Sequence, residues 1–346
     1  MRIVELSGSS AGGVRAHVAD VLAALDDQQI ALLAPDAVID YCQARQPSRL
    51  RYERVRVSTT PQLADVATLA TITRYAKGAD VIHAHTLRAG AYAALALRTL
   101  RRRPPLVVTI HNRPTGQSAV VRMGEVLKRL VIAHATKILA VSPDISTWLA
   151  RDGAKADLAV IPARKLPPAR QLPAVQGGPV LVTVARLSHQ KGLDLLLDTA
   201  ATLQREFPQL QWVIVGEGPL RAALETAISR RALPVTLVGQ VEDLAGYFFV
   251  ADLVVQTSRW EGQPVAMQEA IHAGAAIVAT DVGGTSHVLG PEIPAVAPAD
   301  LCDAIAALLR DPKARRARSA AARRRSKTLP TIADLRTQLL TVLGSV

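Results

Sequence analysis

Short runs of aliphatic and β-branched residues recur along the chain, and amphipathic stretches lie between most of them. In the first half these runs predict strands at residues 3–7, 30–34, 54–57, 81–85, 106–111, 138–142 and 158–161. The stretches between them predict helices at residues 14–25, 61–77, 88–102, 119–135 and 146–151. Continuous apolar strands joined by helices are typical of parallel sheets that helices cover on both faces.

The second half repeats this alternation. Strands are predicted at residues 180–185, 211–215, 235–237, 253–256, 276–279 and 295–296, and helices at 192–206, 220–230, 265–273 and 301–310. Residues 161–179, between the halves, contain five prolines and two adjacent glycines, which neither a helix nor a central strand tolerates. We therefore expect an α/β protein with two doubly wound, Rossmann-like domains and a ligand site in the cleft between them.

The expected domains are residues 1–168, residues 172–328, and a C-terminal helix at 329–346 that packs back on the first domain. The 346 residues are 49% hydrophobic, which is enough for large cores and excludes a disordered chain. Cys42 and Cys302, the two cysteines, exclude a disulfide scaffold and a multi-cysteine metal site. The start lacks the apolar run of a signal peptide, and no apolar stretch is long enough to span a membrane, so we expect a cytoplasmic protein.

Positive charge is concentrated in the first half. Residues 1–170 carry a net charge of +11 and residues 171–346 one of +1, although the segment 313–327 holds eight basic residues and no acid. A basic surface attracts nucleic acid, anionic lipid or phosphorylated small molecules, and composition leaves these open. The chain has three Phe, three Trp and five Tyr, too few for base-stacking platforms, so we expect no nucleic-acid partner.

Three motifs carry candidate chemistry at the ends of predicted strands. The first, GSSAGGVRAHV at residues 8–18, brings Gly12 and Gly13 to the start of a helix, where backbone N–H groups favour an anion. The second, VARLSHQKG at residues 184–192, offers a guanidinium and an ammonium, Arg186 and Lys191, for a diphosphate. An ordinary tight turn and solvated surface cations are the respective alternatives.

The third motif is RWEGQPVAMQEAIHAG at residues 259–274. Pro264 suits the first helical turn, so Glu261 is expected in the loop and Glu269 inside the helix. Carboxylates at these places are natural acceptors for sugar hydroxyls. The alternative is a pair of acids that the helix dipole favours at its start.

Taken in order, the glycine-rich loop, R-x4-K-G, VGEGPL at 215–220, E-x7-E and TDVGG at 280–284 resemble the family 4 retaining glycosyltransferases of GT-B fold. The resemblance covers roughly residues 3–310. It implies two Rossmann-like domains that face a cleft, and transfer of a sugar from a nucleotide diphosphate to a glycan, lipid or small-molecule acceptor. The donor, UDP- or GDP-linked, is a substrate, and no cofactor or metal is expected.

The resemblance also implies roles for individual residues. It places Gly12 and Gly13 at the donor phosphates, Arg186 and Lys191 at the diphosphate, Gly216, Gln240 and Val241 at the base, Glu269 at the ribose, Glu261 with Gly262, Gln263, Pro264 and Val265 at the sugar, and His111 near the reacting carbon. Many members have Phe-Gly where this chain has Gln263-Pro264. Without an Asp-x-Asp motif, the cations would stabilise the leaving group, and His83, His85, His134, His272 and His287 show no metal-ligand spacing.

Other functions stay open from the residues alone. A GT-B sugar-nucleotide epimerase and a catalytically idle nucleotide-sugar-binding protein are the alternatives. The segment 119–135 predicts an amphipathic helix with a basic rim, to which Arg98, Arg101, Arg102 and Arg103 could add, and which suits an anionic membrane surface and a lipid-linked acceptor. The competing interpretation is that this helix packs its apolar face on the sheet.

Overall fold

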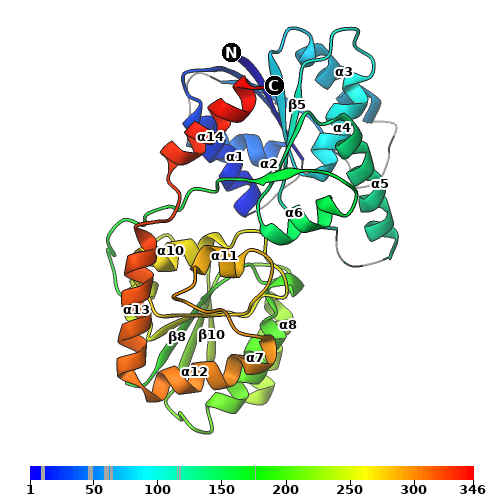
Figure 1. Cartoon of the computed structure of the whole chain (residues 1–346). Helices are drawn as coiled ribbons and strands as arrows, with labels where there is room; N and C mark the ends of the chain where they lie inside the picture. The colour runs from blue at the N-terminus through cyan, green and yellow to red at the C-terminus, as the bar shows by residue number, and fades with distance from the viewer. Residues whose placement is uncertain are drawn as a thin grey trace. The chain divides into compact units, whose positions relative to one another are not determined.

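The computed structural model describes residues 1–8, 12–45, 50–57, 62, 65–114, 116, 118–175 and 177–346. The chain forms two compact units. Unit 1 comprises Met1–Pro162 and Pro330–Val346, and unit 2 comprises Ala163–Leu329. Each unit is a parallel β-sheet with helices on both faces (Figure 1).

Unit 1 is built on a seven-stranded parallel sheet with the order β3-β2-β1-β4-β5-β6-β7. Its strands are β1 (Arg2–Ser7), β2 (Gln29–Ala34), β3 (Arg51–Arg54), β4 (Val81–His85), β5 (Leu106–Ile110), β6 (Lys137–Ala140) and β7 (Ala156–Leu158). The strand order reverses between β1 and β4, which pair in parallel with Ser7 opposite His85. In doubly wound sheets such a reversal leaves a crevice at the carboxyl ends of the two strands.

The helices of unit 1 are α1 (Gly13–Ala24), α2 (Asp36–Gln43), α3 (Asp65–Ala76), α4 (Leu87–Leu97), α5 (Ser118–His134), α6 (Pro143–Ala150) and α14 (Ile332–Gly344). Helices α1, α2 and α14 pack together on one face of the sheet, and α3, α4 and α5 cover the other (Figure 1). Strands β4 and β5 are buried along their whole length, as strands between two helical layers must be.

The C-terminal helix α14 belongs to unit 1. The Arg336 guanidinium donates to the Asp27 carboxylate at 2.7 Å, beyond the end of α1. Gln338 accepts from the Val160 amide at 2.8 Å and donates to the Leu158 carbonyl at 2.7 Å. These contacts join the last residues of the chain to elements that precede them by about 180 or more positions.

Unit 2 has a five-stranded parallel sheet with the order β10-β9-β8-β11-β12. The strands are β8 (Val180–Val184), β9 (Gln211–Val215), β10 (Val235–Gly239), β11 (Leu253–Gln256) and β12 (Ile277–Ala279). The helices are α7 (Leu193–Leu203), α8 (Arg221–Arg231), α9 (Leu244–Val250), α10 (Val265–Ala273), α11 (Thr285–Leu289), α12 (Leu301–Arg310) and α13 (Pro312–Ser326). Two short 3-10 helices, η1 (His189–Lys191) and η2 (Pro298–Asp300), complete the unit, and its strand order reverses between β8 and β11.

Two apolar cores flank the sheet of unit 2. One core packs α7, α8 and α12 around the fully buried Trp212, and the other packs α9, α10, α11 and α13 around Met267 and Ile271. The alternating strands and helices that the apolar pattern predicts therefore exist, and each core covers one face of the sheet.

Several predicted boundaries are wrong. The strand expected at 54–57 is Arg51–Arg54, because the backbone of that segment pairs with β2, while the apolar Val55 and Val57 follow it as buried loop residues. Residues 295–296 form a single bridge between Val296 and Thr280 rather than a strand. Short helices α2, α9 and α11 were not predicted. The units divide after Pro162, because Ala163 and Leu166 pack on the core of unit 2.

Candidate functional site

The candidate residues of unit 2 gather where its strand order reverses. Arg186 and Lys191 follow β8, and Glu261 follows β11, its neighbour in the sheet. The carboxyl ends of these strands meet at one edge, so side chains from segments 70 residues apart come into contact there.

Lys191 and Glu261 form an ion pair. The Lys191 Nζ atom donates to Glu261 Oε1 at 2.5 Å, and the Ser258 hydroxyl donates to the same oxygen at 2.6 Å. Glu261 is buried at 7% exposure, whereas the Lys191 side chain is 22% exposed. The ammonium therefore keeps an open side, while the carboxylate is held by two donors.

Hydrogen bonds to backbone carbonyls connect the two loops that carry this pair. The Thr257 hydroxyl donates to the Lys191 carbonyl at 2.8 Å, and the Arg259 amide donates to the Gln190 carbonyl at 2.8 Å. Gly192 has a φ of 58° and lies so close to Thr257 that a Cβ would stand 2.1 Å from its carbonyl oxygen. The pair is thus set by the backbone rather than by two flexible side chains alone.

A second close approach fixes the Glu261 backbone. Gly283 has a φ of 53°, and a Cβ there would lie 1.8 Å from the Glu261 carbonyl oxygen. This conformation and this distance both require glycine. The TDVGG motif at 280–284 is therefore explained by its contact with the loop that holds Glu261.

Glu269 lies on α10, as the sequence predicts, and is half-buried. Desolvation raises the pKa of its carboxyl from 4.5 to about 7, although Arg164 opposes that rise. The carboxyl can thus change its protonation state near neutral pH. It contributes a hydrogen-bond acceptor when ionised and a donor when protonated.

The loop from Gly262 to Pro264 leads into α10. The helix begins at Val265, and Pro264 is its N-cap residue with extended backbone, so the expectation that Pro264 lies in the first helical turn is wrong by one position. The amides of Val265 and Ala266 have no intrahelical acceptor, as in the first turn of any helix. Backbone donors therefore stand four and five residues after Glu261.

Gly216, directly after β9, lies close to the backbone that follows β8. It has a φ of 143°, and a Cβ there would lie 2.0 Å from the Ala185 carbonyl oxygen, directly before Arg186. Val241, close after β10, lines a cavity with Tyr247 and the segment 167–174, whereas Gln240 is not among its lining residues. The Arg186 side chain is exposed and forms no hydrogen bond or ion pair with the residues that the structure describes.

Unit 1 presents its candidates where β1 and β4 meet. Gly12 is the N-cap of α1 with a φ of 65°, Gly13 is the first residue of that helix, and both are exposed. The rest of the predicted glycine-rich loop, residues 9–11, lies outside the described residues. Gly8 precedes residues 9–11, and a Cβ added to it would lie 3.5 Å from the Thr86 hydroxyl oxygen.

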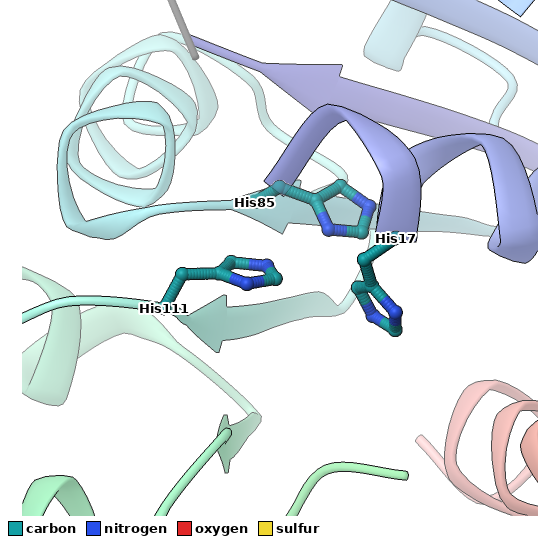
Figure 2. A group of neighbouring side chains, drawn as sticks. All are labelled: His17, His85 and His111. Atoms are coloured by element: carbon teal, nitrogen blue, oxygen red, sulfur yellow. The ribbon is translucent and has the colours of Figure 1, made fainter. Parts of the chain in front are cut away.

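His111 directly follows β5 and adjoins two histidines to which the sequence analysis gave no role, His17 on α1 and His85 at the end of β4 (Figure 2). All three are buried. Desolvation, followed by neighbouring histidines, lowers the pKa of His17, of His85 and of His111, although Glu5 opposes the shift at His85.

A polar network lies beneath these histidines in the sheet. Glu5 Oε2 accepts from His85 Nε2 at 2.8 Å and lies 3.0 Å from His83 Nδ1, while His83 Nε2 lies 2.8 Å from the Thr109 hydroxyl. Burial raises the pKa of Glu5, but the two histidines outweigh it and bring the pKa to about 2. The spacing His83-x-His85 in a strand, which puts both rings on one face, is the signal that could have revealed this network.

Solved structures share this arrangement of strands and helices. The Anabaena protein HepE in complex with UDP-glucose superposes with a TM-score of 0.83 at 21% identity, over all of both chains. A sucrose-phosphate synthase from Thermosynechococcus elongatus reaches 0.78 at 19% identity, over 99% of this chain and 98% of that one. These likenesses establish the two-domain GT-B fold.

Curated relatives match over shorter stretches. Alpha-D-kanosaminyltransferase of Streptomyces kanamyceticus is 32% identical over 146 residues, which are 40% of this chain and 38% of that protein. The amylovoran biosynthesis glycosyltransferase AmsK of Erwinia amylovora is 31% identical over 140 residues, which are 37% of this chain and 34% of that protein. The match thus spans less than half the length of either relative.

Two family models match the chain one after the other. The glycosyl transferase 4-like domain matches residues 12–164, which include Gly12, Gly13 and His111. The group 1 glycosyl transferases match residues 169–325, which include Arg186, Lys191, Glu261 and Glu269. With the GT-B fold and the paired models, the chain belongs to the family 4 type of glycosyltransferases.

Proposed function

We propose that this chain transfers a sugar from a nucleotide diphosphate to an acceptor with retention of the anomeric configuration. The observation that carries the proposal is the Lys191–Glu261 pair at the carboxyl ends of β8 and β11. The Arg186 guanidinium, which also follows β8, is exposed and has no partner among the described residues. A cation with an open side and an exposed guanidinium suit a diphosphate, and a fixed carboxylate suits sugar hydroxyls. The epimerase and the idle binding protein have no comparable support.

The two cations would provide most of the stabilisation of the leaving diphosphate. As the acceptor oxygen bonds to the anomeric carbon, the bond from that carbon to the phosphate oxygen breaks, and the acceptor proton passes to the leaving phosphate on the same face. Arg186 and Lys191 would stabilise the negative charge that develops on the diphosphate. In this scheme no metal holds the diphosphate.

Glu261 and Glu269 would divide recognition of the donor. Glu261 would turn from its pairing with Lys191 to the hydroxyls of the transferred sugar, with the amides after Gly262 beside it. Glu269 would accept hydrogen bonds from the ribose hydroxyls, for which its ionised form is the better acceptor. Gln263, in place of the more common Phe, adds an amide that can bind a further hydroxyl.

Unit 1 would supply the glycines at the start of α1 for the donor phosphates and His111 for the transferred sugar near the reacting carbon. The buried imidazole of His111 is neutral at physiological pH, because its pKa lies well below the usual value. It can therefore act through hydrogen bonds at the sugar without adding positive charge. UDP sugars are the first donors to test, since solved structures of this fold hold UDP and UDP-glucose.

The proposal is tested with UDP-glucose in the absence of acceptor, followed by proton NMR. Slow hydrolysis that releases UDP with α-glucose as the first anomer supports a retaining transferase. The appearance of β-glucose first would contradict retention, and an epimerised nucleotide sugar would favour the epimerase. A melting-temperature panel with UDP, GDP and ADP comes first and selects the base, because a ligand of the native state raises apparent stability.

A second proposal concerns the acceptor side, and its evidence lies on α5. Val120, Met123 and Val126 are 43%, 41% and 59% exposed, and Arg122 and Arg129 on the same helix carry the basic charge. The competing interpretation, an apolar face packed on the sheet, fails for these three apolar residues. None of the described helices is long and apolar enough to cross a membrane.

The buried side of α5 explains this unusual orientation. Lys128 is buried there, with Nζ 2.5 Å from both Glu125 and Asp152 and 4.4 Å from the centre of the Trp148 ring. Gly124 lies against Pro114, where a Cβ would clash at 2.1 Å. Small and paired charged residues thus fix the inner side, and apolar and basic residues remain outside.

We infer that this outer face binds an anionic lipid surface, where a lipid-linked acceptor would be found. Apolar side chains would enter the headgroup region, and each nearby arginine would add about 1 kcal/mol. Co-sedimentation with phosphatidylglycerol vesicles, but not with phosphatidylcholine, is expected at low salt and is lost in Met123→Ser/Val126→Ser. Val66→Ser on α3, where Val66 is as exposed as Val126, is the matched control. Equal binding to both lipids, or to neither, would refute the inference.

A further inference from the structure

Three histidines from distant parts of the sequence surround one point in unit 1 (Figure 2). The ring centroids of His17 and His85 lie 5.7 Å apart, those of His17 and His111 5.2 Å, and those of His85 and His111 5.8 Å. One ligand nitrogen from each ring lies within 4.8 Å of the other two. The rings come from α1, β4 and the residue after β5, so the fold alone brings them together.

Each ring leaves one buried nitrogen without a hydrogen-bond partner among the described residues. These atoms are His17 Nδ1, His85 Nδ1 and His111 Nε2. A buried polar atom without a partner costs free energy, and native proteins keep few of them. Three such atoms on three adjoining rings indicate a shared ligand that satisfies them together.

The Glu5 carboxylate determines which kind of atom His85 offers. A carboxylate oxygen accepts hydrogen bonds, and Glu5 Oε2 lies 2.8 Å from His85 Nε2, so His85 Nε2 is the nitrogen that donates. In the neutral ring Nδ1 then has a free lone pair. A carboxylate that orients a histidine whose other nitrogen binds a metal is a recurrent arrangement in metalloproteins.

The dimensions also suit a metal. Three imidazoles bound tetrahedrally with bonds of about 2.0–2.1 Å have ring centroids roughly 5 Å apart. The observed spacings exceed this by less than about an ångström, which small rotations of the rings can close. The neighbouring group Glu5, His83 and His85 is a poorer site, since both nitrogens of His83 already face Glu5 and Thr109.

We propose that His17, His85 and His111 bind one divalent transition-metal ion of the Zn²⁺ class, with Glu5 orienting His85. Nitrogen ligands select such ions over Mg²⁺ and Ca²⁺, which prefer oxygen. Three protein ligands leave a fourth position for water or substrate. One consequence rests on the proposed function, in which His111 contacts the transferred sugar. An ion bound to His111 would compete with that sugar, so Zn²⁺ would inhibit transfer.

The test is titration of the full chain with Zn²⁺ alone, without nucleotide. The protein carries no histidine tag and is first stripped with a chelator, and binding is followed by calorimetry and by the visible absorption of Co²⁺. We expect about one ion per chain, with affinity reduced roughly tenfold or more in His17→Gln, in His111→Gln and in Glu5→Gln. His134→Gln, which alters a half-buried histidine of the same unit, is the control and binds as the wild type does.

Circular dichroism confirms that each variant is folded. The proposal is overturned if folded wild type binds no Zn²⁺, or if His17→Gln and His111→Gln both retain wild-type affinity. A chain that binds Zn²⁺ at these histidines but releases no nucleoside diphosphate from any sugar donor would refute the proposed function and leave the metal site standing. Conversely, an active transferase that Zn²⁺ does not inhibit would refute the competition at His111.

Discussion

Lys191 Nζ and Glu261 Oε1 lie 2.5 Å apart, although the family resemblance implies that one residue binds the donor's phosphates and the other its sugar. In this structure the Lys191 ammonium and the Glu261 carboxylate therefore bind each other. Donor binding has to exchange this contact for two new ones. The ion pair keeps a buried carboxylate from lying unpaired, and it holds the ammonium in place before the diphosphate arrives.

This exchange predicts opposite effects of two substitutions on free-nucleotide binding. Lys191→Ala removes a charge-assisted contact worth about 1.5–3 kcal/mol, so UDP affinity falls roughly ten- to a hundredfold. Glu261→Gln removes the competing carboxylate, so UDP affinity is kept or rises while turnover of the sugar donor falls. Calorimetry with UDP measures both. A loss of UDP affinity in Glu261→Gln as large as that in Lys191→Ala would contradict the assigned roles.

Glu269 makes donor binding depend on pH. With a pKa of about 7, its carboxyl is mostly protonated at pH 6 and mostly ionised at pH 8. If the ribose binds the ionised form, affinity for UDP-glucose rises by about tenfold between these values, and protons are released on binding. Calorimetry in two buffers of different ionisation enthalpy detects that release. Glu269→Gln abolishes it, and a pH-independent wild type would count against the ribose contact.

The same raised pKa predicts a pH-dependent stability. Below about pH 4.5 the carboxyl is protonated in both states, so its contribution is fully present there. That contribution is lost as the pH rises through 7, since the native state resists ionisation. A shift from 4.5 to about 7 corresponds to about 3 kcal/mol. Relative to wild type, Glu269→Gln should therefore become more stable by roughly this amount between pH 4.5 and 8, as measured by urea unfolding; an unchanged difference would show that Glu269 is not desolvated.

Gly283 tests how tightly the Glu261 loop is held. Gly283→Ala adds a methyl group that would lie 1.8 Å from the Glu261 carbonyl oxygen, at a φ of 53°. We expect a loss of stability of about 1–3 kcal/mol or more and a displaced Glu261 loop. Gly177→Ala, with no neighbouring atom within 4 Å and without positive φ, is the control. Equal melting temperatures of the two variants would show that the loop yields easily.

Much of the fold follows from the apolar pattern. The strands at Val81–His85, Gln211–Val215 and Leu253–Gln256 have the predicted bounds, because each is a mostly apolar, largely buried run inside a parallel sheet. The edge strand β3 was misplaced, since its pairing depends on backbone bonds to β2 rather than on apolar side chains. Short helices such as α11 escape the pattern because they contain too few turns for a helical period to be recognised.

The site was predictable as separate pieces but not as an arrangement. Arg186, Lys191, Glu261 and Glu269 stand where a β-α turn and a helix start were expected, and yet the direct pairing of Lys191 with Glu261 depends on the neighbouring positions of β8 and β11. The meeting of His17 and His85 with His111 has the same cause. On α5, the sequence pattern left two orientations open, and the burial of Lys128, whose charge two carboxylates and Trp148 compensate, decides between them.

The central claim is that unit 2 holds a nucleotide diphosphate through Arg186 and Lys191. Calorimetric titration with UDP, GDP and ADP compares wild type with Arg186→Ala/Lys191→Ala and with Arg230→Ala/Lys313→Ala, which removes two exposed cations elsewhere in the unit. The account predicts that wild type and the control bind at least one of these nucleotides equally, and that the first double variant loses affinity roughly a hundredfold or more. Wild-type affinity in the folded Arg186→Ala/Lys191→Ala protein, or no binding of any of the three nucleotides by the wild type, would contradict it.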